Sequence, residues 1–420
     1  FFLRAGETHG GAVGRGRLGQ GLCREAPFIS SRMQRAGSAL RKMCSEVAST
    51  LPFAQHIATR EIANPFPGIT FLEKAIGRKI TARIGSNESI PPPSNPLDKV
   101  LPEQLLELCR LYPDPYCRSM RATLADLCGT TADEVLVDAG ADALICLVLR
   151  VRVNPGDTVV TTAGTYPTFK YFAGGVGADI TEVAYKDDPA TGQLCVDLEA
   201  LAAAATEHSA SVVYLANPDN PTGHVHSAAD IQKLRGALPA HTTLIVDEAY
   251  IDFSPANALP ARLPNTIQLR TLSKAYALAG LRVGYCLASP EWVLKADTVR
   301  IQYGVNNLSN YLAETLLADR SFSKGLITET VRLRDALRDE LIGKGLRVQP
   351  SSTNFVCIRY GSPEEALARQ KLLFGHGAAV HRPPHPAMHS YIRVSAHPLS
   401  LAPEVIHELS RPDWKEASQA

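Results

Sequence analysis

Residues 211–250 read SVVYLANPDNPTGHVHSAADIQKLRGALPAHTTLIVDEAY and contain an apolar run, a polar turn, a helical pattern and a second apolar run. The apolar runs are short, rich in β-branched residues and followed by turn-forming residues, which is typical of buried strands. We therefore expect strands at Ser211–Ala216 and Thr243–Asp247, with a helix at Ala228–Leu238 between them. This order predicts a parallel pair of strands in an α/β sheet.

The same alternation extends from about residue 100 to residue 290. Further strands are expected at Val135–Asp138, Thr158–Thr161, Ile180–Ala184, Thr266–Thr271 and Val283–Leu287. Further helices are expected at Ala141–Val153, Thr168–Gly177 and Val196–Ala205. Nearly all-apolar strands indicate a mainly parallel, seven-stranded sheet with helices on both faces. Ligands of such sheets bind beyond the carboxyl ends of the strands, where the polar residues of interest fall.

The pattern changes after about residue 310, where helices dominate and strands become few. The expected elements are helices at Tyr311–Ala318, Ile327–Ile342 and Pro363–Phe374, and strands at Asn354–Arg359 and Tyr391–Ser395. We interpret 96–310 as a large domain and 311–420 as a smaller α+β domain. Residues 46–95 are expected to form an N-terminal arm and to complete the smaller domain.

Composition excludes several classes of protein. The formal net charge of +1 gives no reason to expect binding to nucleic acid or to a membrane surface. No apolar run reaches the ~18 residues that a membrane span needs. The nine cysteines are scattered without a CxxC pair, which argues against a disulfide framework or a zinc site. A reducing compartment, the cytoplasm, and the absence of a metal site are therefore expected.

Residues 1–45 have a different composition from the rest. They contain eight Lys and Arg side chains but only two acids, Glu7 and Glu25. A basic, serine-containing and acid-poor leader resembles a transit peptide, which would place the protein in a plastid or mitochondrion. The alternatives are a disordered extension and translated sequence upstream of a start at Met33.

Three short segments follow predicted strands and carry polar residues. They are NPDNPTG at 217–223, DEAY at 247–250 and TLSK at 271–274, the last followed by Gly280-Leu281-Arg282. Taken singly, the first is typical of a turn, the second of a helix N-cap and the third of a surface lysine. Their joint order and spacing are far more specific than any one of them.

Together these segments resemble the site of the fold-type I aminotransferases, which depend on pyridoxal 5′-phosphate (PLP). The likeness runs from about residue 46 to the C-terminus and is strongest to the histidinol-phosphate aminotransferase branch. That branch has similar NPDNPTG, DEAY, TLSKAxxLAGLRxGY and YPDP segments, the last matching 112–115 here. The resemblance implies an α/β fold-type I PLP-transferase.

The resemblance also assigns roles around the cofactor ring. Lys274 would hold PLP as a Schiff base and later move a proton. Asp247 would keep the ring nitrogen protonated, since a nearby carboxylate favours the cationic form. Asn220 and Tyr250 would hydrogen-bond the ring oxygen. Lys274, Asp247 and Tyr250 are thus the predicted catalytic residues.

The cofactor phosphate needs backbone N–H groups at a helix N-terminus, together with hydroxyls and a cation. Segment 138–143, DAGADA, joins a predicted strand to a predicted helix and matches the family's phosphate-binding turn. The matching phosphate ligands are Ala141, Asp142, Thr271, Ser273 and Arg282.

Two tyrosines complete the predicted cofactor site. Tyr166 matches the aromatic residue that stacks on the ring, although one tyrosine at a strand–helix junction can equally be ordinary packing. Tyr112 matches the tyrosine that reaches the phosphate of the neighbouring subunit. The resemblance therefore implies a homodimer with shared active sites.

Substrate recognition is assigned to three residues. Arg393 and Arg382 match arginines that bind anionic groups, for which a planar guanidinium is suited. For each, a surface salt bridge is the alternative. Asn87, in GSNES, resembles the family's ANEN segment near the substrate entrance. The sequence departs from the family there, with Ser89-Ile90-Pro91 in place of a compact turn, which puts the contacts of that turn in doubt.

The implied partners are an amino donor and a 2-oxo acid, and the predicted pair is L-histidinol phosphate with 2-oxoglutarate. Three alternatives stay open. The chain could be an aminotransferase for aromatic or other amino acids, or a PLP-dependent decarboxylase of a phosphorylated amino acid. It could also be a non-catalytic homologue, although only Schiff-base chemistry calls for a lysine at position 274.

Overall fold

The computed structural model describes residues 53–58, 66, 68–92, 101–188, 192–255, 258 and 262–417. The predicted leader, residues 1–45, lies outside the described residues, and its interpretation stays a prediction. Parts of the predicted arm at 46–95 also lie outside the described residues. Among the described residues, no helix is both long enough and apolar enough to cross a membrane.

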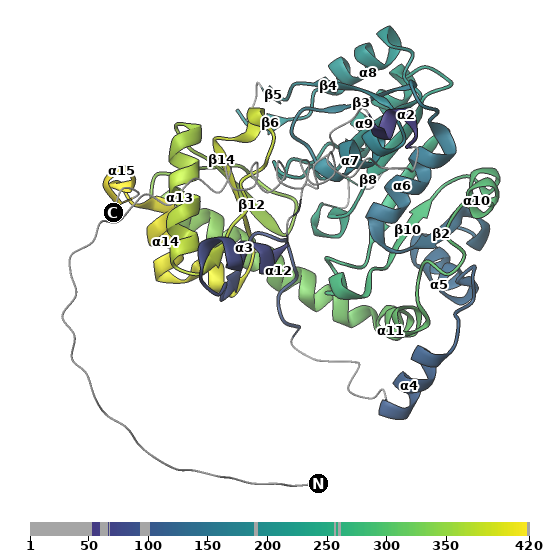
Figure 1. Cartoon of the computed structure of the whole chain (residues 1–420), viewed down its shortest axis with the longest axis horizontal. Helices are drawn as coiled ribbons and strands as arrows, with labels where there is room; N and C mark the ends of the chain where they lie inside the picture. Colours follow the sequence, from purple (N-terminus) through teal and green to yellow (C-terminus); the bar gives the residue numbers. More distant parts are fainter. Residues whose placement is uncertain are drawn as a thin grey trace. The chain divides into compact units, whose positions relative to one another are not determined.

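A seven-stranded sheet with the order β2-β10-β9-β8-β7-β3-β4 organises the large part of the fold (Figure 1). Its strands are β2 (Val135–Asp138), β3 (Thr158–Thr162), β4 (Asp179–Val183), β7 (Val212–Ala216), β8 (Thr243–Asp247), β9 (Thr266–Thr271) and β10 (Gly284–Leu287). Only β10 runs antiparallel to its neighbours. The predicted mainly parallel sheet is confirmed, and the bounds of its seven strands differ from prediction by at most one residue.

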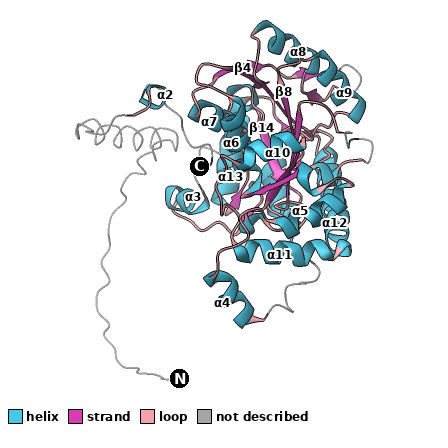
Figure 2. Cartoon of the chain, turned by 90° about the vertical axis from the view of Figure 1, so that its right-hand side faces the viewer, coloured by secondary structure: helices cyan, strands magenta, loops and turns pink. Residues whose placement is uncertain are grey.

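Helices cover both faces of this sheet (Figure 2). On β8, Leu244 and Val246 pack into one apolar cluster, which includes Ile231 of helix α9 (Ala228–Ala237). Ile245 points the other way, into a cluster that includes Leu144 of helix α6 (Gly140–Arg152). Alternate side chains of a strand face opposite sides, so a strand that is apolar at every position needs cover on both. This explains why the chain alternates strands and helices.

The helices around the sheet are α5 (Arg118–Cys128), α6 (Gly140–Arg152), α7 (Pro167–Gly175), α8 (Leu198–Glu207), α9 (Ala228–Ala237), α10 (Pro290–Asp297), α11 (Asn307–Ala318) and α12 (Arg320–Gly343). Helix α4 (Pro102–Arg110) precedes them. Helices α6 to α9 start within two residues of their predicted positions. Helices α4, α5 and α10 were not predicted from the sequence, and α12 starts at Arg320, seven residues before the predicted Ile327.

The C-terminal part has its own antiparallel sheet, ordered β11-β12-β14. Its elements are β11 (Arg347–Val348), β12 (Phe355–Arg359), α13 (Pro363–Gly375), β13 (Ala378–Ala379), β14 (Tyr391–Ser395), α14 (Pro403–Ser410) and α15 (Trp414–Ala417). In Figure 1 the helices α13, α14 and α15 gather on one side, coloured yellow-green to yellow.

A short N-terminal segment joins this C-terminal part. Strand β1 (Ala82–Arg83) pairs in parallel with β13, and helix α3 (Ile69–Ile76) precedes it. Two further short elements are helix α2 (Gln55–Ala58) and the hairpin of β5 (Lys186–Asp187) with β6 (Leu194–Cys195). Residues 53–420 form one compact unit, so the proposed division at residue 310 remains a prediction.

Core packing of α12 gives a test of the fold. Leu337 of α12 is fully buried, whereas Leu294 of α10 is 68% exposed. Leu337→Ala should lower the free energy of unfolding by about 2–5 kcal/mol, because the truncation leaves a cavity. Leu294→Ala should change it by less than about 1 kcal/mol. Urea unfolding followed by tryptophan fluorescence measures both, and equal losses would contradict this packing.

Candidate active site

A cavity of about 480 Å³ lies at the carboxyl ends of the parallel strands. Strand β8 ends at Asp247, the loop after β7 carries Asn220, and the segment after β9 carries Lys274. The predicted site residues that line the cavity are Asn87, Ala141, Asp142, Tyr166, Asn220, Asp247, Tyr250, Thr271, Ser273, Lys274, Arg282 and Arg393. Segments far apart in the sequence therefore meet around one space.

Lys274 presents a partly buried amine in this cavity. Its Nζ donates a hydrogen bond to the backbone oxygen of Asn87 at 2.9 Å. Burial, followed by the positive charge of Arg393, lowers the pKa of Lys274 to about 8. A lowered pKa leaves a substantial fraction of the amine neutral near physiological pH, which is the nucleophilic form.

Asp247 is a buried carboxylate. Its Oδ2 accepts a hydrogen bond from the hydroxyl of Tyr214 at 2.6 Å, and its Oδ1 accepts one from the backbone N–H of Ala249 at 3.1 Å. Burial raises the pKa of Asp247 to about 6, so the group is mostly ionised at neutral pH. No cation of the described chain forms an ion pair with it. A buried negative charge in this position favours a cationic ligand group.

Asn87 ties the N-terminal segment to the cavity. Its Nδ2 donates to the hydroxyl of Tyr250 at 2.9 Å, and its Oδ1 accepts from the hydroxyl of Ser395 at 3.1 Å. Its backbone oxygen accepts from Asn354 as well as from Lys274. Its φ of +54° lies in the left-handed region, which asparagine tolerates better than most residues. Asn87 thus holds Tyr250 and Lys274 in fixed relation.

Asn220 and Arg393 form a direct pair across the cavity. Arg393 Nη1 donates to Asn220 Oδ1 at 2.5 Å, and Nη2 donates to the backbone oxygen of Gly85 at 2.7 Å. Only 4% of Arg393 is exposed, and among the described residues no carboxylate forms an ion pair with it. Its guanidinium lines the cavity, so its positive charge is suited to an anionic ligand.

The loop that carries Asn220 is stabilised by hydrogen bonds to a buried carboxylate. The carboxylate of Asp219 accepts hydrogen bonds from the hydroxyls of Thr165, Tyr185 and Thr222, at 2.7–2.9 Å. The peptide bond between Asn217 and Pro218 is cis. The turn predicted from NPDNPTG is therefore present. Asp219, which the sequence analysis did not single out, supports it.

An anion-binding corner lies at the start of α6. No side chain caps this helix, so the N–H groups of its first turn are available to a ligand. The hydroxyl of Thr271 donates to that of Ser273 at 2.8 Å, and Arg282 Nη1 donates to Ser273 Oγ at 3.4 Å. Gly140 has a φ of +83°, in the left-handed region that glycine adopts without strain, and a Cβ there would lie 2.6 Å from Arg282 Nη2.

Tyr166 stands at the N-terminus of α7 and lines the cavity. Its hydroxyl donates to Asp142 Oδ1 at 2.8 Å, while Arg282 lies 3.6 Å from Asp142 Oδ2. Burial raises the pKa of Tyr166, so the phenol stays protonated and keeps this hydrogen bond. The stacking role expected for Tyr166 stays a prediction.

Two predicted site residues do not line the cavity. Arg382 donates from Nη1 to the backbone oxygen of His389 at 3.4 Å. His381 lines the cavity instead, because His381 pairs with Arg393 across a β-bridge and successive residues of an extended chain face opposite sides. The predicted substrate contact of Arg382 is therefore not formed in this cavity, and its role stays a prediction.

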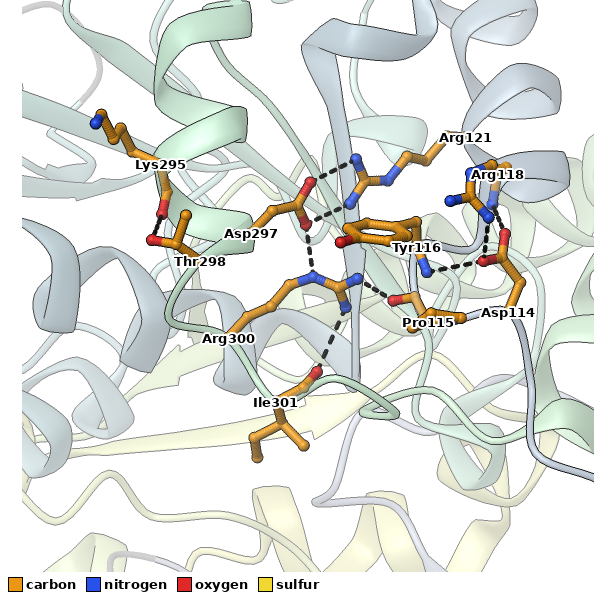
Figure 3. Close-up of polar contacts among 10 residues, drawn as sticks. All are labelled: Asp114, Pro115, Tyr116, Arg118, Arg121, Lys295, Asp297, Thr298, Arg300 and Ile301. Atoms are coloured by element: carbon orange, nitrogen blue, oxygen red, sulfur yellow. Dashed lines mark hydrogen bonds and ion pairs between the residues drawn. The ribbon is translucent and has the colours of Figure 1, made fainter.

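The second is Tyr112, which is 82% exposed. Its ring packs against that of Tyr303, with centroids 4.9 Å apart. Figure 3 shows the segment that follows it, Asp114 to Tyr116, joined to a cluster of arginines. An exposed position is what the predicted contact with a neighbouring subunit requires, and this contact stays a prediction.

Sequence reasoning missed one wall of the cavity. Helix α3 and the segment before it contribute Phe66, Ile69 and Leu72, and α13 contributes Gln370 and Phe374. Nothing in the spacing of these apolar residues marks them as ligand contacts. The position of His381 in the cavity could have been predicted only by assuming that His381 pairs with Arg393 in a sheet.

The sequence comparisons identify the family of this chain. Residues 94–409 match the family described as Aminotransferase class I and II. The chain belongs to this family. Histidinol-phosphate aminotransferase 1 of Mesorhizobium japonicum is 31% identical over 356 residues, covering 81% of this chain and 94% of the relative. An aromatic amino acid aminotransferase of Nocardia farcinica is 32% identical over 289 residues, covering 67% of this chain and 79% of the relative.

The solved structures agree with these relatives. Histidinol-phosphate aminotransferase from Sinorhizobium meliloti, determined in complex with PLP, superposes with a TM-score of 0.79 at 33% identity. The match covers 89% of this aminotransferase and 99% of that chain. The predicted α/β fold-type I class, the enzyme class and the cofactor are thereby confirmed. The non-catalytic alternative is not supported.

The cavity of this aminotransferase fits PLP. Its features match the parts of the cofactor: an amine with a lowered pKa at Lys274, a buried carboxylate at Asp247, and the anion-binding corner at α6. Within the described ranges, no group of three or more His, Cys, Asp or Glu side chains could hold a metal ion. We assign the individual contacts of PLP to the predicted residues as a proposal.

The lowered pKa of Lys274 predicts a pH effect on the apoenzyme. Between about pH 8 and the ordinary lysine pKa of about 10.4, the unfolded state binds more protons at this site than the folded state. Stability contributed by this site should therefore rise across that window, by up to about 3 kcal/mol.

The comparison is between wild type and Lys274→Met. Urea unfolding of both apoproteins is measured at pH 7.5 and at about pH 10.5. At pH 7.5 Lys274→Met should have a larger free energy of unfolding than wild type, and this difference should shrink as the pH rises. Lys324→Met, at an exposed position of α12, is the control and should show no such convergence. A constant difference between wild type and Lys274→Met would contradict a lowered pKa.

Proposed function

We propose that this aminotransferase transfers the amino group of L-histidinol phosphate to 2-oxoglutarate and acts as a homodimer. The observation that carries the substrate proposal is that the buried guanidinium of Arg393 lines the same cavity as several apolar side chains. Its positive charge suits one anionic group, while Phe66, Leu72 and Phe374 suit a flat ring. Histidinol phosphate carries one phosphate and one imidazole. The relatives from Mesorhizobium japonicum and Sinorhizobium meliloti support the same substrate.

Bound PLP supplies an electron-withdrawing ring, and the chain's own groups do the rest. The neutral form of Lys274 Nζ can take a proton from the substrate's Cα and return it elsewhere. The Asp247 carboxylate holds a proton at the ring nitrogen by favouring its cationic form. The Tyr250 hydroxyl accepts a hydrogen bond from Asn87, which leaves its own O–H available to donate towards the cavity, and burial raises the pKa of Tyr250, so the phenol stays protonated.

The dimer proposal rests on an exposed apolar surface. Leu101 and Leu106 of the α4 region, with Leu111 and Tyr112 after it, are all exposed. Apolar side chains gathered in this way are typical of an interaction surface. The family's tyrosine at the position of Tyr112 acts across a dimer interface, so this surface is the one that a second copy would cover.

A second candidate function is the transamination of aromatic amino acids. Of the two arginines predicted to bind substrate, Arg393 alone lines the cavity, and one arginine is sufficient for the carboxylate of an aromatic amino acid. The relative from Nocardia farcinica also carries this activity in its name. Both candidates need one anion and one ring, so only kinetics separates them.

The deciding experiment is a half-reaction screen. Purified enzyme with PLP should lose its visible cofactor absorbance with histidinol phosphate at least tenfold faster, per unit concentration, than with phenylalanine or tyrosine. That ratio corresponds to about 1.4 kcal/mol of transition-state binding. The reverse order would move the proposal to aromatic amino acids. Release of CO₂ from a phosphorylated amino acid would favour the decarboxylase, and Lys274→Ala should show no reaction with any substrate.

Arg393 provides the second test. Arg393→Gln should lower the second-order rate constant of the half-reaction by roughly 10- to 100-fold, because a charged hydrogen bond to the substrate's anion is lost. Arg359→Gln, on the neighbouring strand β12 with its side chain about half exposed, should leave the rate unchanged. Equal effects of the two changes would exclude Arg393 as the anion-binding group.

A further inference from the structure

The segment between α4 and α5 holds Tyr112 at the surface on a stiff turn. Asp114 Oδ1 accepts from the backbone N–H of Tyr116 at 3.1 Å, and Oδ2 accepts from that of Arg118 at 2.8 Å. Pro113 and Pro115 fix the backbone on either side of Asp114, since the proline ring restricts φ. The turn therefore has little freedom of its own.

Arg300 fastens this turn to the body of the protein (Figure 3). Its Nη2 donates to the backbone oxygen of Pro115, and its guanidinium lies over the ring of Tyr116, 5.6 Å from the centroid. Its Nε donates to Asp297 Oδ1 at 2.6 Å. Arg121 completes the cluster with two hydrogen bonds to Asp297, at 2.8 and 3.0 Å.

The side chains of Arg300, Arg121 and Asp297, which form this cluster, are almost completely buried. The exposed fractions of the side chains are 3% for Arg300, 9% for Arg121 and 13% for Asp297. Removing three charges from water costs free energy that their mutual attraction repays only in part, so stability alone is a poor reason for such an arrangement. A fixed position for the turn is a better one.

The loop after Arg300 makes two further contacts. Tyr303 packs on Tyr112, as described above. A Cβ on Gly304 would lie 2.5 Å from Oδ1 of Asp138, the last residue of β2, which precedes the anion-binding corner of the same chain. The loop that follows Arg300 therefore approaches both Tyr112 and the last residue of β2.

We propose that Arg300 is a positioning residue that holds Tyr112 in place to serve the PLP phosphate of the partner subunit. The inference rests on the proposed homodimer. Arg300 does not touch the cofactor in this arrangement. It acts through the backbone of Pro115 and through the loop that carries Tyr303, so its influence is exerted on the other subunit's site.

The first measurement is the dissociation constant of PLP for the apoenzyme, by absorbance titration. Arg300→Gln should weaken PLP binding roughly tenfold or more, as loss of one hydrogen bond to a charged group does. Arg369→Gln is the matched control. Arg369 is also buried, pairs with Glu365 and donates to the backbone oxygen of Leu409. It should lose comparable stability but keep its affinity for PLP.

A hybrid dimer separates action on the partner from action within one chain. One subunit carries Lys274→Ala and the other carries Arg300→Gln, so only the second can give the visible absorbance of covalently held PLP. That site receives Tyr112 from a subunit with an intact Arg300. Its affinity should therefore return to the wild-type value. In the reverse hybrid, wild type with a Lys274→Ala, Arg300→Gln double mutant, the affinity should be weak.

Each outcome decides something. Unchanged PLP affinity in the Arg300→Gln homodimer, or a first hybrid that stays weak, would overturn the role of Arg300 while leaving the dimer intact. Failure of the chains to dimerise would instead refute the proposed dimer, and this inference with it. If Arg300→Gln does not fold, Tyr303→Ala at the surface takes its place. It should weaken PLP binding in the homodimer and recover in the same hybrid.

Discussion

Burial of an amine and a carboxylate in one cavity is the constraint on which the rest of the site depends. Burial disfavours the charged forms of Lys274 and Asp247, so it lowers the pKa of Lys274 to about 8 and raises that of Asp247 to about 6. An environment that holds both groups out of water, without pairing them to each other, leaves each ready for a ligand. The parallel sheet makes this possible, because its strands deliver both residues to the same edge.

The walls of the cavity come from parts of the chain that the sheet does not contain. Asn87 joins the N-terminal segment to Tyr250 and Lys274, and Arg393 joins the C-terminal sheet to Asn220. These hydrogen bonds span separations of more than 150 residues. The position of the Lys274 amine relative to the Arg393 guanidinium thus depends on how the C-terminal part packs on the large sheet.

Particular elements show which features could be predicted. Strand β8 was predicted correctly because Leu244, Ile245 and Val246 form an uninterrupted apolar run that ends at the polar Asp247. Helix α10 was missed, although Ser289 accepts from the N–H of Trp292 and Pro290 occupies the first turn, a start signal that can be read from sequence. Most residues of the site were found through motifs, whereas Phe66, Leu72 and Phe374 carry no motif.

The sequence by itself determined the fold class, the cofactor and most of the predicted residues that line the cavity, because strand periodicity and short motifs are local properties of the chain. Only the tertiary structure decided which side chains meet at the substrate end. His381 rather than Arg382 faces the cavity because a β-bridge to Arg393 sets the side on which each residue projects. Such pairing depends on contacts between distant segments, and a one-residue shift would exchange the two side chains.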